Sequence, residues 1–213
     1  MPPAKILIGA LAVFFIALPC LADVPNDIPD LSHSVATIAY NGPGTPSLLV
    51  VPDGTGNPFT AAHDEEGNVV DATITLTILD TLDVPIANYP FEDLWLESMD
   101  GGLVPCIGGT TADYNTDAGG MTQWVYPLRA AGYSEAPVLV LINGDALVTN
   151  PGLSLKFNSP DINSDGIVNL TDAAMASQDY YSGYHFRCDW NGDGALDLRD
   201  VPILASHFGT QCP

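Results

Sequence analysis

The chain has 213 residues, enough for one or two domains, and its 26 acidic residues against five Lys and Arg give a formal net charge of -21. A surface of this sign repels nucleic acid and anionic membranes, so neither is an expected partner. Such a surface suits divalent cations, and a generally acidic extracellular protein would share it.

The N-terminus has the pattern of a secretory signal peptide over residues 1–22. Lys5 is followed by an uncharged apolar run, Ile6–Leu18, and then by small residues, with cleavage expected after Ala22. The run is shorter than the about 20 residues that a bilayer span needs. No second run of this kind follows. We therefore expect a secreted or cell-surface protein with no membrane insertion after cleavage.

Residues 23–157 carry the signals of a mainly β domain. In DATITLTILD (71–80), apolar residues alternate with threonines, which is the period of a half-buried strand. Gly-, Pro- and Asn-rich turns separate this segment from other short apolar runs. Those runs are Val35–Tyr40, Leu48–Val51, Leu94–Leu96, Met121–Leu128, Val138–Ile142 and Leu153–Phe157. Roughly seven short strands with frequent turns predict an antiparallel β-sandwich.

Two segments of this region resemble the bacterial immunoglobulin-like domains of the invasin and intimin kind. They are DATITLTILDTLDVPIANYPFEDLWL and ADYNTDAGGMTQWVYPLRAAGY. The shared pattern is a strand that ends in Asp, a Pro-containing strand, and Thr-Asp-x-Gly before a further strand. Asp80, Pro85, Thr116, Asp117 and Gly120 occupy those places. The resemblance implies an immunoglobulin-like fold that serves as a spacer or adhesive module without catalysis.

The composition changes after Phe157. Asn158–Pro160 is expected to be a short linker, and residues 158–213 are expected to form a small α-helical module. This module has two acidic loops, each followed by a short helix.

The first acidic loop, DINSDGIVNLTD, starts at Asp161 and has the spacing of a twelve-residue calcium loop. Gly166 at position 6 permits the sharp turn that such a loop needs. Val168 at position 8 is expected to pair with its counterpart in the second loop. The expected oxygen ligands are the side chains of Asp161, Asn163, Asp165, Asn169 and Asp172 and the carbonyl of Ile167.

The second loop, DWNGDGALDLRD, begins 28 residues later at Asp189 and repeats the pattern, with Leu196 in the place of Val168. A single loop of this kind is also compatible with a solvated cluster of turns. Two loops in register favour two bound calcium ions. The second set of expected ligands is Asp189, Asn191, Asp193, the carbonyl of Ala195, Asp197 and Asp200.

Paired loops of this form, with Asp at position 12 where EF-hands have Glu, resemble type I dockerin modules. The resemblance covers about residues 158–213 and implies two calcium-loaded loop–helix units whose helices pack through apolar residues. The expected packing residues are Ala173, Met175, Ala176, Tyr180, Val201, Leu204, Ala205 and Phe208. Pro202 lies in the first turn of its helix, where proline is tolerated. We expect calcium binding and folding to be coupled, because close carboxylates repel one another without metal.

In the dockerin family, positions 10 and 11 of each loop carry recognition of a cohesin, often as a Ser-Thr pair. Here these positions hold Leu170 and Thr171, then Leu198 and Arg199. The expected partner is a cohesin-like or other cell-surface protein. The departure from the family pattern also leaves docking onto the chain's own β domain as an alternative.

Three cysteines remain after signal cleavage. Cys188 precedes the second loop and Cys212 is the penultimate residue, so a disulfide between them is expected in an exported protein. Cys106 is left over as a buried or reactive thiol in this scheme.

No catalytic constellation is apparent. The acidic HDEE run at 63–66 is expected to be a solvated loop, and the chain has neither a G-x-S-x-G motif nor a glycine-rich phosphate loop. The alternative function is carbohydrate binding, with polysaccharide as the partner. The binding surface would be an aromatic face formed by Trp95, Trp124, Tyr126 and Tyr133. The favoured interpretation instead places Trp95 and Trp124 in the core of the sandwich.

Overall fold

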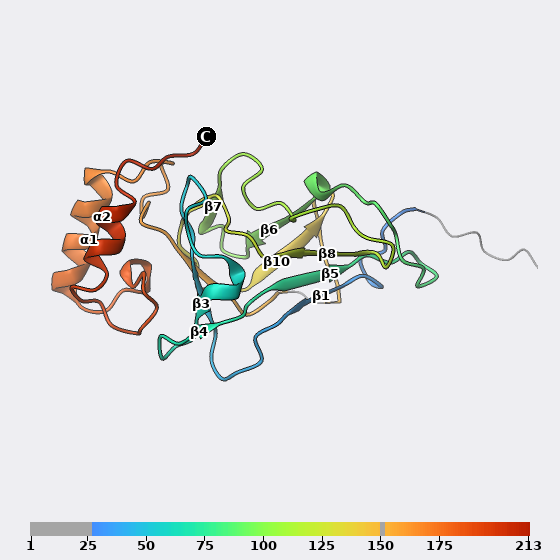
Figure 1. The fold of residues 1–213 in the computed structure, drawn as a ribbon, viewed down its shortest axis with the longest axis horizontal. Helices are drawn as coiled ribbons and strands as arrows, with labels where there is room; N and C mark the ends of the chain where they lie inside the picture. Colours follow the sequence, from blue (N-terminus) through green and yellow to red (C-terminus); the bar gives the residue numbers. More distant parts are fainter. Residues whose placement is uncertain (1–26, 150–151) are drawn as a thin grey trace, which may run out of the picture.

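The computed structural model describes residues 27–149 and 152–213, so the predicted signal peptide lies outside the described residues. A β-rich body is followed by a small helical part that packs against one end of it (Figure 1). The strands are β1 (Val35–Ile38), β2 (Ser47–Leu49), β3 (Ala62–His63), β4 (Val69–Val70), β5 (Ile74–Thr77), β6 (Leu94–Ser98), β7 (Leu103–Pro105), β8 (Met121–Trp124), β9 (Ala130–Gly132), β10 (Val138–Ile142), β11 (Asp145–Ala146) and β12 (Lys156–Asn158). The helices are α1 (Leu170–Ser182) and α2 (Val201–Ser206), with single 3-10 turns η1 (Phe59–Ala61), η2 (Phe91–Asp93) and η3 (Phe186–Cys188).

The strand pairing follows the order of an immunoglobulin-like sandwich. One sheet has the antiparallel order β1-β5-β8, and a second has the antiparallel order β11-β10-β6. Antiparallel bridges Val138↔Leu153 and Ser134↔Phe157 add the segment that leads into β12 beside β10. With β1, β5 and β8 as strands A, B and E, and β6, β10 and this last segment as C, F and G, the arrangement matches the ABE and CFG sheets of that fold. β12 then pairs in parallel with β2.

One hydrophobic core lies between these sheets. Along β5, Ile74 and Leu76 are buried, whereas the intervening Thr75 and Thr77 are only half-buried, as the alternation in the sequence predicted. Trp124 from β8 is fully buried in the same core, and its indole N–H donates to the carbonyl of Thr110 at 3.0 Å. Each of the seven predicted strand segments overlaps an observed strand: β10 has the predicted bounds, β6 is longer than predicted, and the others are shorter.

A second, smaller core lies between the helical part and the β body. Ile162 and Trp190, each at position 2 of an acidic loop, pack with Leu49, Val51 and the thiol of Cys188. Met175, Ala176, Leu196, Ile203 and Leu204 pack around this cluster. Among the expected helix-packing residues, Tyr180, Val201, Ala205 and Phe208 are instead exposed. The small module thus fills its core from its loops and from the β body.

The expected linker is in fact a buried connection. Asn158 ends β12, and Asn158, Ser159 and Pro160 are all buried. The Asn158 side-chain amide donates to the carbonyls of Phe186 and Asp189, because β12 runs directly under η3. Within the described residues, no helix is both long and apolar enough to cross a membrane.

Candidate metal sites

The first acidic loop is wrapped around its own two terminal carboxylates. Asp161 accepts hydrogen bonds from the backbone N–H groups of Asp165 at 3.2 Å and Gly166 at 2.8 Å. Asp172 accepts from the N–H groups of Ile162 and Asn169, both at 2.9 Å. Asn169 and Asp172 also form the capping box of α1, so the end of the loop is the start of the helix.

The second loop repeats these contacts 28 residues later. Asp189 accepts from the N–H groups of Asp193 at 3.2 Å and Gly194 at 2.9 Å. Asp200 accepts from the N–H groups of Trp190 and Asp197, both at 3.0 Å. The two loops therefore share this pattern of backbone hydrogen bonds to the carboxylates at positions 1 and 12.

The glycine at position 6 has the role that the sequence predicted. Gly166 has φ +86° and Gly194 has φ +76°, in the left-handed region that favours glycine. Ile167 and Ala195 follow at position 7, and their N–H groups donate to the side chains of Asp165 and Asp193 at 3.1 and 3.0 Å.

The carboxylates at positions 1 and 12 are buried in both loops. Asp161 and Asp172 are 0% exposed, and Asp189 and Asp200 are 1% exposed. Burial raises the pKa of Asp161, and the negative charges of Asp172 and Asp165 raise this pKa further. Burial is also the main cause that raises the pKa of Asp189 and Asp200. Loop 1 contains no Lys, Arg or His that would offset its charge.

The donor set consists of oxygen atoms only. The loops offer carboxylates, the Asn163 and Asn191 side-chain carbonyls and the position 7 backbone carbonyls, which are ligands that Ca²⁺ prefers. In the part of the chain that the structure describes, no group of three or more His, Cys, Asp or Glu side chains is arranged to hold a metal ion. The carboxylates are instead engaged by the backbone donors described above. The donor chemistry fits calcium, and a metal would need the exposed Asp165 and half-buried Asp193 to turn inward.

The expected pairing between Val168 and Leu196 is wrong. The N–H of Val168 donates to the carbonyl of Thr210 at 3.0 Å, and the N–H of Gly209 donates to the carbonyl of Val168 at 2.8 Å. A bridge between Ile167 and Gln211 continues this short ladder. The C-terminal segment takes the place beside loop 1 that the second loop was expected to take.

The expected Cys188–Cys212 disulfide is also wrong. Cys212 is bonded to Cys106, with a Cα–Cα distance of 5.5 Å. The reason is the ladder above, which carries Cys212 past loop 1, where its N–H donates to the carbonyl of Gly166 at 2.9 Å. Cys188 is a free buried thiol.

A buried ion pair beside Cys188 was not foreseen from the sequence. Asp179 of α1 accepts from Arg187 Nε at 2.5 Å and Nη2 at 2.7 Å, and the Cys188 thiol donates to the same carboxylate at 3.2 Å. The Arg187 hydrogen bond lowers the pKa of Asp179, whereas burial and the bond to Asp179 raise that of the Cys188 thiol. Arg187 also lies 5.7 Å from the centre of the Tyr133 ring. The sequence pattern around Asp179 does not indicate that Arg187 is its partner.

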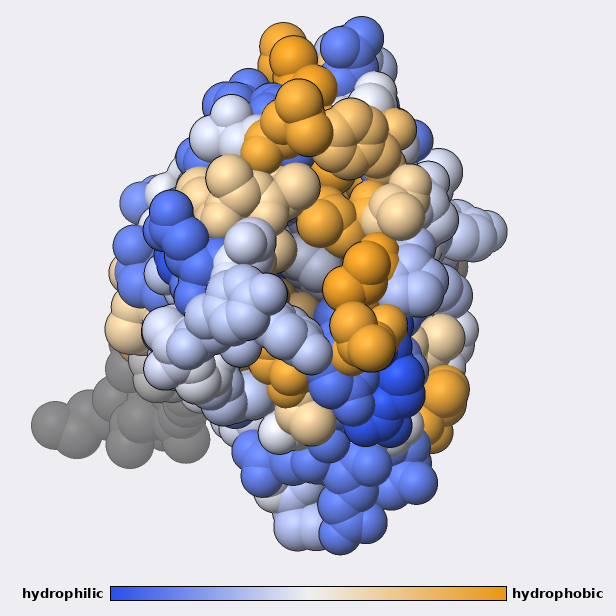
Figure 2. Space-filling view, turned by 90° about the vertical axis from the view of Figure 1, so that its left-hand side faces the viewer, coloured by the Kyte–Doolittle hydropathy of each residue, from blue (hydrophilic) through white to orange (hydrophobic). Residues whose placement is uncertain are grey.

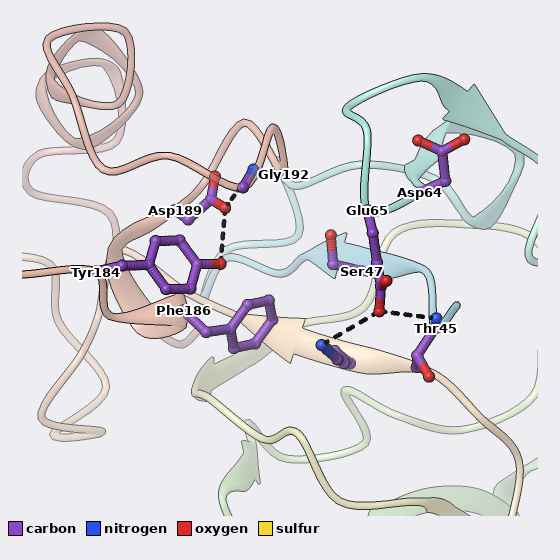
Figure 3. A pocket seen from close by; sticks show the side chains of 10 residues that line it. Thr45, Ser47, Asp64, Glu65, Tyr184, Phe186, Asp189 and Gly192 are labelled. Atoms are coloured by element: carbon purple, nitrogen blue, oxygen red, sulfur yellow. Dashed lines mark hydrogen bonds and ion pairs between the residues drawn. The ribbon is translucent and has the colours of Figure 1, made fainter. Parts of the chain in front are cut away.

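Loop 2 faces the β3–β4 hairpin across a polar cavity of about 200 Å³ (Figure 3). On one side, the Tyr184 hydroxyl donates to Asp189 at 3.0 Å. On the other side, Glu65 accepts from the N–H of Thr45 at 3.3 Å and lies 3.9 Å from Lys156. A Cβ on Gly192 would lie 2.7 Å from that of His63, so the loop approaches the hairpin closely. The second loop is thus docked on the β body.

The HDEE run is the turn of this hairpin. Asp64 accepts from the N–H groups of Glu66 and Asn68, both at 2.9 Å, so that its carboxylate holds the turn. Nothing in these contacts indicates acid–base chemistry.

The predicted aromatic face is not formed as a unit. Trp124 is fully buried, as expected for a core residue, whereas Trp95 on β6 is only half-buried and donates to Glu97 at 2.9 Å. Tyr126 is exposed on its own, and Tyr133 lies beside Arg187.

No family model matches the chain, and no curated protein matches it at a significant level. Among solved structures, the chain is similar to one described as the crystal structure of the Lin-41 filamin domain, at 12% identity. The match covers 60% of this chain and 95% of that one, with a TM-score of 0.28. This score is too low to place the chain in a family.

Proposed function

We propose that this protein is a non-catalytic binding protein that works outside the cell and is stabilised by two calcium ions. The observation that carries the proposal is the repeated loop geometry, with buried carboxylates at both ends of each loop. Export is supported by the N-terminal sequence and by the Cys106–Cys212 disulfide, because such bonds persist in oxidising compartments.

Calcium would act here as a structural ion. Buried carboxylates that lack a cationic partner are costly, and a divalent ion would neutralise them. The helical module offers only a small core for compensation, so metal binding and folding of residues 158–213 would be coupled. This coupling of metal binding to folding agrees with the resemblance of the tail to dockerin modules.

The partner surface that we favour is an apolar cavity of about 310 Å³ between α1, loop 2 and α2. Hydrophobic residues form an irregular band across this face of the molecule (Figure 2). Leu198, at position 10 of loop 2, lines the cavity and is 73% exposed. Trp190 also lines the cavity, and its indole N–H is, among the described residues, a buried polar group without a hydrogen-bond partner.

These properties specify the chemistry of the partner. It would be a separate, cohesin-like or cell-surface protein that inserts an apolar side chain into the cavity. The net charge of -21 favours a basic surface around that side chain. Polysaccharide binding has weaker support, because Trp124 is in the core and cannot contribute to an aromatic face.

Calcium titration of the metal-stripped mature chain, residues 23–213, tests the proposal. We expect two binding events by calorimetry and an increase in helical circular dichroism. Saturation should raise the free energy of unfolding by about 2.7 kcal/mol for each site at roughly one hundred times Kd. Asp165→Ala combined with Asp193→Ala should abolish both events, because each variant removes the position 5 ligand.

The matched control is Glu92→Ala, which removes an exposed carboxylate of the β body that is not among the expected ligands. It should bind calcium like the unmodified chain. The proposal is wrong if millimolar calcium produces neither heat nor a change in the unfolding midpoint.

A further inference from the structure

The two loops differ at position 9, which is Asn169 in loop 1 and Asp197 in loop 2, and at position 11. In loop 2, Arg199 Nη1 lies 2.6 Å from Asp193 Oδ2, and its Nη2 and Nε lie 2.7 and 3.0 Å from Asp197 Oδ2. The guanidinium therefore bridges the carboxylates at positions 5 and 9. In loop 1 the equivalent residue is Thr171, which carries no charge.

We propose that Arg199 is a built-in competitor of calcium, so that loop 2 binds calcium more weakly than loop 1 and fills second. This inference rests on the proposed calcium function. Arg199 occupies two of the expected ligands with a rigid fork of donors, and a metal would have to displace it before Asp193 and Asp197 turn inward.

The setting of Arg199 permits this displacement. Its side chain is 64% exposed, so it can move into solvent without leaving a cavity. Asp193 is more enclosed, with a side chain 16% exposed, and loses a close counter-ion when Arg199 leaves. The same contact gives loop 2 an internal cation in the absence of metal, which loop 1 lacks.

Reciprocal substitution in single-loop proteins tests the inference. Asp165→Ala disables loop 1, and in that background Arg199→Thr should tighten calcium binding by loop 2 about three- to tenfold. Asp193→Ala disables loop 2, and in that background Thr171→Arg should weaken binding by loop 1 by a similar factor. Calcium displacement of terbium supplies a loop-specific optical signal, because Trp190 lies in loop 2 and Ile162 takes its place in loop 1.

Two controls separate a local effect from a change in net charge. Arg129→Thr removes one positive charge from the β body and should leave both affinities unchanged, and Arg199→Lys should give an intermediate affinity. In the otherwise unmodified chain, Arg199→Thr should bring the two binding constants closer together, which provides a readout if a single-loop protein does not fold.

The outcomes distinguish the inference from the function on which it rests. Two loops that bind with equal affinity, and a loop 2 affinity that Arg199→Thr does not change, would overturn the role of Arg199 and leave calcium binding intact. Absence of binding in the unmodified chain and in every variant would overturn both.

Discussion

Replacing both Cys106 and Cys212 with serine is expected to lower the free energy of unfolding by about 4–5 kcal/mol. The bond joins residues 106 positions apart, so it removes much of the conformational freedom of the unfolded chain. It also anchors the C-terminal ladder along loop 1. The loss should therefore be measured by urea denaturation at a fixed, saturating calcium concentration.

Peptide mapping under non-reducing conditions supplies the matching chemical test. The fragment that contains Cys106 should be recovered linked to the C-terminal fragment, and the two should separate only after reduction. A Cys188→Ala variant should retain this cross-link, because Cys188 is a free thiol. A Cys188–Cys212 cross-link, or an unchanged unfolding midpoint in the serine variant, would contradict the observed pairing.

Replacing Arg187 with methionine is expected to lower the free energy of unfolding by about 3–5 kcal/mol. Methionine keeps much of the apolar stem but removes the guanidinium, which leaves the Asp179 carboxylate, 5% exposed, without its counter-ion. The control is Arg129→Met in the β body, where the lost contact is a 3.2 Å hydrogen bond to the Gly108 carbonyl. An effect of Arg187→Met no larger than that of the control would contradict a structural role for the pair.

The same ion pair has a defined pH dependence. Because Arg187 lowers the pKa of Asp179 in the folded state, the contribution of the pair is present above the unfolded Asp pKa of about 3.9. It is lost as the pH falls through the lower folded pKa. The difference in stability between the unmodified chain and Arg187→Met should therefore shrink below about pH 4. Denaturation at several pH values measures this difference directly.

The β body was predictable where strands are long and alternate. The segment around Ile74 and Leu76 has a clear period of two, and β5 lies within it. Strands β3, β4, β7, β9 and β11 have two or three residues each and were missed, because so few residues show no period. The wrapped loops were predictable because acids, amides and a glycine must stand at fixed positions to turn the chain.

The contacts between the two parts of the chain could not be predicted in the same way. The composition around Asn158 is typical of a linker. In the structure, Asn158 is buried between the β body and the helical part, and its side-chain amide donates a hydrogen bond to a backbone carbonyl of the helical part. The pairing of Cys212 depends on the path of the C-terminal segment along loop 1, which leaves no periodic signal. The sequence places Arg199 only at a position that carries recognition in dockerins, because its contact with Asp193 requires the loop to fold first.

The disulfide has a mechanical consequence for the chain. Tension applied at the two ends of the chain would pass from the β body through Cys106 directly to Cys212 and out at the C-terminus. Residues 107–211, which include both acidic loops and both helices, lie outside this covalent path. A pulling force would therefore not extend the candidate calcium loops while the bond is intact, and reduction would place them under tension.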